Sequence, residues 1–238
     1  MERKYTGIIL NKKDSNEASR IYTIYTLEEG KIQAIAQGAR KARSKLAGNL
    51  ENFILADIFV AKSKGRGRIT GAVAEKVFLN MRNDFESLNC VFRAARLLDK
   101  LTGIGEKDEK IFNLFHEFLS AVDKLAGEKT GTGELLLRGF ILKLLDCLGY
   151  KIEANFCVSC SKKLLEKGNF FSAEKGGFIC GACAGKEERK LSVTANVIKI
   201  MRIALNSKIA SLEKLKVSEK DMENMKKITE EFVVWVSN

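Results

Sequence analysis

Four cysteines constrain the fold of this chain more than any other feature of its sequence. They form two pairs, Cys157-Val-Ser-Cys160 and Cys180-Gly-Ala-Cys183, with nineteen residues between the pairs. A gap of two residues lets one tight turn direct both sulfurs toward a single ion, and two such pairs at this spacing are typical of a four-thiolate zinc site. Four thiolates fill the coordination sphere of zinc, so we expect one structural zinc ion.

The segment between the pairs has the pattern of a β-hairpin. Two short apolar runs, 169–172 and 178–179, flank the turn Lys175-Gly176-Gly177. We therefore expect a zinc ribbon at about residues 154–186. Disulfides would require an oxidising compartment, and we find no signal peptide at the start of the sequence. These observations favour a reducing, cytoplasmic location.

Positive charge is concentrated in the first third of the chain. The net charge is +11. Residues 1–80 hold 15 Lys and Arg against 8 Asp and Glu, and the other 158 residues hold 26 against 22. Such an excess indicates a polyanionic partner, nucleic acid first and an anionic membrane surface second. No apolar run reaches the length of about eighteen residues that a transmembrane span requires.

Short strands with alternating polarity are expected in the same third. In one of them Ile54, Ala56 and Ile58 share a face. Five short strands suit a small closed barrel, and the OB-fold, a five-stranded barrel that binds single strands, is the natural candidate for residues 1–79. The expected strands cover residues 5–10, 20–26, 31–37, 52–62 and 68–74.

The period of the apolar residues becomes helical after residue 80. We expect helices over 87–101, from Asp108 onward, and over 134–148, 192–206 and 218–236. The helix 134–148 is apolar nearly all round and should be buried. The fold class is therefore α+β multidomain: an N-terminal OB barrel, then a mainly helical domain, 80–238, with an inserted zinc ribbon.

Two segments between the predicted strands carry four cations each and no acid. The first holds Arg40, Lys41, Arg43 and Lys45, and the second holds Lys62, Lys64, Arg66 and Arg68. Long cationic side chains on loops at one rim of a barrel can neutralise successive phosphates. Tyr22, Tyr25, Phe53 and Phe59 are possible stacking surfaces for bases, although core packing is the commoner fate of strand aromatics.

Signals of catalysis are weak. The one histidine, His116, falls on the polar side of its helix, and the sequence has neither a Walker-type phosphate loop nor a complete dinucleotide fingerprint. We expect a binding protein and no enzyme. On the helix 134–148, Glu134 and Arg138 lie one turn apart among apolar residues. A cation beside apolar surface suits a pocket for an acidic, hydrophobic peptide; the alternative is a buried helix whose few polar residues reach a seam.

Motifs in the same order over nearly the whole chain resemble those of the RecO family of bacterial DNA repair proteins. The barrel resemblance rests on Gly7-Ile-Ile-Leu, Glu17, Arg20, Tyr25-Thr26, Gly30-Lys31-Ile32, Ala36-Gln37-Gly38-Ala39-Arg40 and Ser44. The helical resemblance rests on Leu137-Arg138-Gly-Phe140, Leu144-Leu145 and Leu148-Gly149-Tyr150, followed at once by the four cysteines. Some members lack the quartet, and this chain resembles the zinc-carrying branch.

The resemblance implies a mediator of recombinational repair that hydrolyses no nucleotide. Such proteins bind single- and double-stranded DNA, anneal complementary strands and, with RecR, help to load RecA onto strands coated by the single-stranded-DNA-binding protein SSB. The resemblance adds Lys31 to the DNA-binding set, implies that Arg138 and Lys143 bind the SSB tail, and implies a cytoplasmic, nucleoid-associated protein. Two rivals stay open: a zinc-ribbon RNA-binding or transcription factor, and a thiol-redox enzyme.

Overall fold

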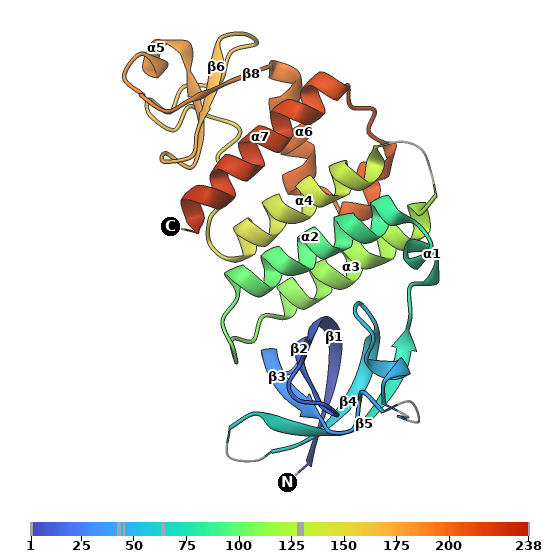
Figure 1. The fold of residues 1–238 in the computed structure, drawn as a ribbon. Helices are drawn as coiled ribbons and strands as arrows, with labels where there is room; N and C mark the ends of the chain where they lie inside the picture. The colour runs from blue at the N-terminus through green and yellow to red at the C-terminus, as the bar shows by residue number, and fades with distance from the viewer. Residues whose placement is uncertain (1, 42–43, 45, 63–64, 128–130, 238) are drawn as a thin grey trace. The chain divides into compact units, whose positions relative to one another are not determined.

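The structure is a computed structural model that describes residues 2–41, 44, 46–62, 65–127 and 131–237. It divides into two compact units, Met1–Gly127 and Glu128–Asn238 (Figure 1). Three helices therefore group with the barrel by their contacts. The division that we expect after residue 79 would instead group these three helices with the helical domain, and it stays a prediction.

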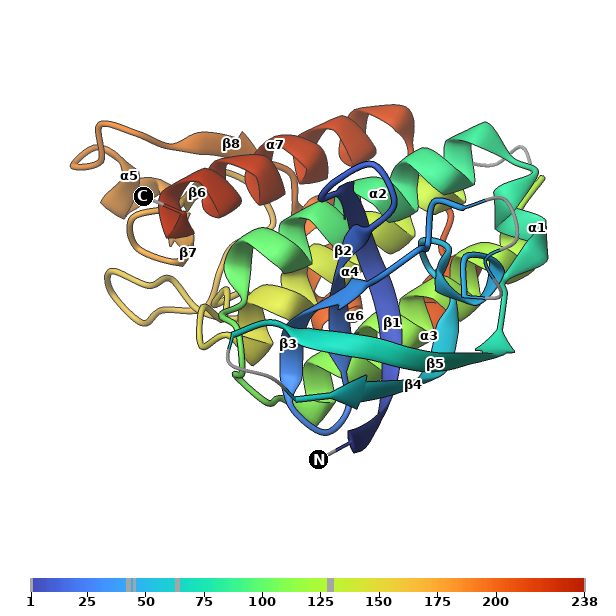
Figure 2. The ribbon, with the colours of Figure 1, turned by 60° about the horizontal axis from the view of Figure 1, so that its bottom comes forward.

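Unit 1 begins with a closed barrel whose strand order is β1-β2-β3-β5-β4, drawn from a second side in Figure 2. Strands β3 and β5 pair in parallel, and the other neighbours pair antiparallel. The expected five-stranded, OB-like barrel is confirmed. Its strands are β1 (Glu2–Asp14), β2 (Arg20–Thr26), β3 (Gly30–Ala36), β4 (Leu55–Ala61) and β5 (Gly67–Lys76).

Strands β1 and β4 have different bounds from those that the sequence predicts. Strand β1 extends beyond the expected 5–10 because its first half pairs with β4 and its second half with β2, so polar ends are included in the ladder. Strand β4 begins only at Leu55 because Phe53 has a left-handed backbone with φ of 65°. A short 3-10 helix, η1 (Gly48–Leu50), precedes that turn.

Helices α1 (Leu79–Arg82), α2 (Phe85–Leu101) and α3 (Glu109–Leu125) complete unit 1. Asp84 caps α2 by accepting from the backbone N–H of Ser87, and Asp108 caps α3. The β2–β3 turn packs closely on the α2–α3 connection: a Cβ on Gly30 would lie 1.9 Å from the carbonyl oxygen of Glu106. Glycine is therefore required at this position, which also has φ of 67°.

Unit 2 is built around the buried helix α4 (Thr132–Cys147), as its all-round apolar pattern predicts. It packs against α6 (Ala195–Asn206), the 3-10 helix η2 (Ile209–Lys214) and α7 (Glu219–Val236). The remainder is a small sheet in the order β7-β6-β8, formed by β6 (Asn169–Ser172), β7 (Gly177–Cys180) and β8 (Leu191–Val193), with the short helix α5 (Gly181–Ala184). In the part of the chain that the structure describes, no helix is long and apolar enough to cross a membrane.

Candidate metal centre and nucleic-acid interface

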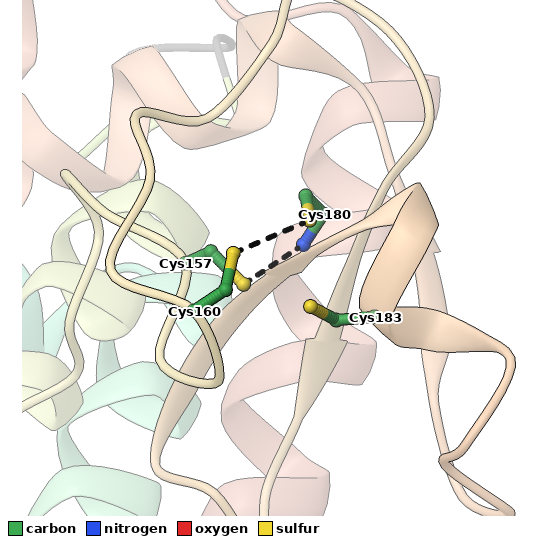
Figure 3. Close-up of side chains that lie close together, drawn as sticks. All are labelled: Cys157, Cys160, Cys180 and Cys183. Atoms are coloured by element: carbon green, nitrogen blue, oxygen red, sulfur yellow. Dashed lines mark hydrogen bonds between the residues drawn. The ribbon is translucent and has the colours of Figure 1, made fainter.

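The four cysteines converge on one point, as the spacing predicts. Cys157 and Cys160 lie on the loop before β6, Cys180 ends β7, and Cys183 lies on α5; Figure 3 shows their side chains close together. All four Sγ atoms lie within 4.8 Å of one another, and those of Cys160 and Cys180 are 3.8 Å apart. A tetrahedral ion with Zn–S bonds of 2.3 Å separates its sulfurs by about 3.8 Å. The quartet can therefore hold a metal ion.

Local backbone geometry positions each pair. The N–H of Cys157 donates to the carbonyl oxygen of Lys162, and the N–H of Ser161 donates to that of Cys157, both at 2.8 Å. Ser161 supplies the left-handed residue of this turn, with φ of 58°. The second pair is carried by the β6–β7 hairpin, whose strands match the expected ones. The N–H of Cys180 then donates to the Sγ of Cys157 at 3.4 Å, which joins the two pairs.

Two thiols of the quartet ionise at very different pH. Burial opposes ionisation of Cys157, but the backbone N–H groups of Cys180 and Ser159 stabilise its thiolate and lower its pKa to about 6. Hydrogen bonds with the sulfurs of Cys160 and Cys180 hold the proton on Cys183 and raise its pKa to about 12. The fold alone thus stabilises one negative sulfur, whereas Cys183 ionises only beside a cation.

Five of the cations expected on the DNA surface are described and exposed: Arg40, Lys41, Lys62, Arg66 and Arg68. Arg43, Lys45 and Lys64 lie outside the described residues. We call the five exposed cations the β3 stripe, because their positions follow that strand.

The stripe runs along β3, so the expected meeting of both loops at one rim is corrected. Lys62 Nζ lies 3.6 Å from Glu29, just before β3; Arg66 Nε donates to Gln33 at 2.9 Å, and Arg68 pairs in register with Ile35. Past the far end of β3, the Nη1 of Arg40 donates to the carbonyl oxygen of Asn16 on the β1–β2 turn at 3.0 Å. A strand of this length spans about 20 Å. The two loops therefore lie toward opposite ends of β3, which links them.

Lys31 is not part of this surface. Its side chain is only 10% exposed, and its Nζ lies 3.0 Å from the carboxylate of Asp99 on α2. The same ammonium donates to the backbone carbonyl of Asp99. It therefore ties the barrel to α2 within unit 1, and we leave it out of the proposed DNA contacts.

The aromatic residues considered as stacking surfaces are mostly in the core. Tyr22, Tyr25 and Phe53 are at most 1% exposed, and Phe59 is half-buried. His116, expected to face solvent, is half-buried beside Phe78, and its burial lowers its pKa. These side chains pack on neighbours that are distant in sequence, which a local period does not reveal.

Arg138 is enclosed in unit 2 and does not present an open cation. The residue is 1% exposed; its Nε donates to Glu134 at 2.7 Å and its Nη1 to the hydroxyl of Thr229 at 2.9 Å. Its Nη2 also lies 3.3 Å from a carboxylate oxygen of Glu230. Lys143 is half-buried, and its Nζ donates to the carbonyl oxygen of Leu205 at 3.0 Å. These contacts agree with the alternative interpretation: α4 is a buried helix, and its few polar side chains bind groups of the neighbouring elements.

Comparison with known proteins matches both parts of the chain to one family. The profile described as Recombination protein O N terminal matches residues 1–78, and that described as Recombination protein O C terminal matches residues 82–236. Between them they cover nearly the whole sequence in the expected order.

Individual relatives agree over most of their length. A DNA repair protein RecO of Dehalococcoides mccartyi is 32% identical over 215 residues, which are 90% of this chain and 83% of the relative. That of Alkaliphilus metalliredigens is 27% identical over 231 residues, 97% of this chain and 92% of the relative. That of Roseiflexus sp. is 31% identical over 212 residues, 89% and 73% of the two chains. The barrel, the helical unit and these matches agree, and the chain belongs to the RecO family of DNA repair proteins.

Proposed function

We propose that this chain is a DNA-binding recombination mediator with no catalytic activity of its own. It binds single- and double-stranded DNA, anneals complementary strands and, together with RecR, assists the loading of RecA onto strands coated by SSB. The β3 stripe is the observation that carries this proposal. In OB-folds the face of strands 2 and 3 and the loops after strands 1 and 4 bind oligonucleotides. Lys62 and Arg66 lie on the loop after β4, Arg66 contacts Gln33 of β3, and Arg40 contacts the loop after β1.

The charges of the stripe suit loose binding of a polyanion. Its ion pairs with Asp14 and Glu29 involve side chains at least one third exposed, and such pairs contribute only about 0–1 kcal/mol. Phosphates can therefore replace these partners at small cost. Two strands repel each other, and a cationic surface that holds both without reading their bases lowers the barrier to their pairing.

We propose that the cysteine quartet, Cys157, Cys160, Cys180 and Cys183, binds one zinc ion with a structural role. Four thiolates leave no open position for substrate, so the ion would hold the ribbon and take no part in DNA chemistry. We also propose a cytoplasmic, nucleoid-associated protein that binds the SSB tail. Arg138 and Lys143 would bind that tail only by exchanging their present partners.

The salt dependence of DNA binding tests the stripe. Replacing Arg40, Lys41, Arg66 and Arg68 by alanine removes four phosphate contacts, and the slope of log K against log salt for single strands should fall by about 3, at about 0.7 per contact. A matched control replaces four exposed cations of unit 2, Lys214, Lys216, Lys220 and Lys227, and should keep the slope. Equal slopes for both variants and the parent protein would remove the stripe as the DNA surface.

Annealing tests the proposal as a whole. Complementary oligonucleotides coated with SSB should pair faster with the parent protein than with the stripe variant. A preference for RNA over single-stranded DNA would instead support the RNA-binding alternative.

A further inference from the structure

A small pocket opens within unit 1, between strand β1 and helix α2. Its volume is about 180 Å³, the space of about six water molecules in the liquid. Such a space accommodates one planar ring system of the size of a nucleobase. Its lining residues are Leu10, Asn11, Phe92, Ala95, Arg96 and Asp99.

Both walls follow from identifiable features of the chain. The register of β1 with β2 shifts between Ile9 and Asn11, a β-bulge that lets two consecutive residues, Leu10 and Asn11, line the same space. The other wall is one face of α2, because its four lining residues follow the spacing i, i+3, i+4 and i+7.

The pocket has a rigid aromatic wall. The ring of Phe92 remains 37% exposed although its neighbours on α2 form the core. Its centroid lies 4.7 Å from that of Phe53 with the rings at 77°, and Phe53 itself is 1% exposed. A buried ring thus holds a partly open one in place, as a stacking surface requires.

Hydrogen-bond donors and acceptors both lie beside this aromatic wall. The Oδ1 of Asn11 accepts from the N–H of Lys12 at 2.8 Å, and its amide nitrogen carries two further donors. Arg96 is exposed, and no ion-pair partner for it occurs among the described residues. Asp99 supplies an acceptor whose carboxylate is held by Lys31. Donors and an acceptor on one aromatic wall are the groups that read a base edge.

The barrel register places the pocket near the β3 stripe. Asn11 pairs with Thr23 of β2, Thr23 pairs with Gln33 of β3, and Gln33 accepts from Arg66. Two strand spacings, about 10 Å, separate Asn11 from Gln33, and the side chain of Arg66 lies a further 2.9 Å away. A single strand whose phosphates follow the stripe can therefore turn one base toward the pocket.

We propose that this pocket binds one unpaired purine base of a single strand held along the β3 stripe, with guanine preferred. Guanine offers the O6 and N7 acceptors that the guanidinium of Arg96 matches, and its N–H groups suit the carboxylate of Asp99. The inference rests on the proposed function and adds a base preference to a surface that otherwise contacts only phosphates.

The experiment compares the affinities of the protein for two single-stranded 12-nucleotide DNA oligonucleotides, measured by fluorescence anisotropy at one fixed salt concentration. One contains thymine alone, and the other alternates thymine and guanine. The parent protein should bind the guanine-containing strand about tenfold more tightly, the discrimination that one good base contact gives. The variants Phe92→Leu and Arg96→Gln should reduce this ratio to near one.

Two matched variants on the same helix serve as controls. Phe85→Leu alters an aromatic residue that is 83% exposed, and Lys100→Gln removes an exposed cation; neither residue lines the pocket. Both should keep the ratio. If Phe92→Leu does not fold, the affinity ratio of Arg96→Gln alone tests the pocket, because Arg96 is exposed.

Each outcome has a distinct consequence. Equal affinity of the parent protein for both strands, with steep salt dependence retained, overturns the base pocket and leaves the proposed function standing. Absence of binding to either strand at low salt overturns both. A ratio that falls equally in the control variants also overturns the pocket, because the effect would then belong to helix α2 in general.

Discussion

The barrel of unit 1 and the cysteine ribbon of unit 2 are both small β-structures, but their cores differ. Among the residues that the structure describes, fifteen buried apolar residues fill the barrel cluster, whereas the ribbon cluster has four: Cys157, Ile179, Cys180 and Ala184. Two of those four are members of the cysteine quartet. The barrel can be stabilised by apolar burial alone, whereas a cluster of four is small, and the proposed ion would supply additional stability.

Loss of the metal should have the largest effect, and only on the ribbon. A strong chelator, or Cys157→Ser, should release one zinc ion per chain, because structural zinc sites contribute about 10 kcal/mol or more to the folding of small ribbons. Hydrogen exchange should then lose protection at β6 and β7 while β1–β5 stay protected. Cys147→Ser, a half-buried cysteine outside the quartet, is the control and should keep its metal. Protection of β6 and β7 without bound metal would show that the ribbon does not depend on the ion for its stability.

A cavity in the barrel core should have the second largest effect, in the opposite region. Ile58 is fully buried, and Ile58→Ala should lower the free energy of unfolding of unit 1 by about 3 kcal/mol through lost contacts and a residual cavity. Denaturant titration measures the loss, and the zinc content should stay at one. Val73→Ala, on the same barrel but 58% exposed, should change stability by less than about 0.5 kcal/mol. A parallel loss of zinc in Ile58→Ala would show that the regions are not independent.

Lower pH should weaken the binding of zinc to the ribbon, and this is the smallest of the three expected effects. Below its pKa of about 12, Cys183 carries a proton that metal binding must displace, so affinity for zinc falls as pH falls. We expect at least a tenfold loss per pH unit, about 1.4 kcal/mol. The loss should steepen below about pH 6, where Cys157 also takes a proton. Competition with a chelating dye between pH 8 and pH 5 measures this, and a pH-independent affinity would exclude thiolate ligation by Cys183.

The features that the sequence predicts correctly are local. The quartet is readable because a two-residue gap fixes each pair, and the β6–β7 hairpin because its turn glycines lie between its two strands. Helix starts are readable for the same reason: Asp108 and Ser218 cap α3 and α7 by accepting from backbone N–H groups two or three residues ahead. Such interactions are complete within a few residues, so no tertiary contact is needed to predict them.

The environments of single charges were decided by the tertiary structure. Lys31 and Asp99 are 68 residues apart in sequence, and Arg138 and Thr229 are 91 apart. The residues next to each cation therefore do not indicate its partner. Phe92 has the spacing of a core residue, yet 37% of it is exposed.

By itself, the sequence determined the order of the elements, the OB-like barrel, the convergence of the four cysteines and the family, because each depends on neighbouring residues or on their order. Only the tertiary structure decided which cations remain exposed to a polyanion, since burial and ion pairing depend on the segments that folding brings together.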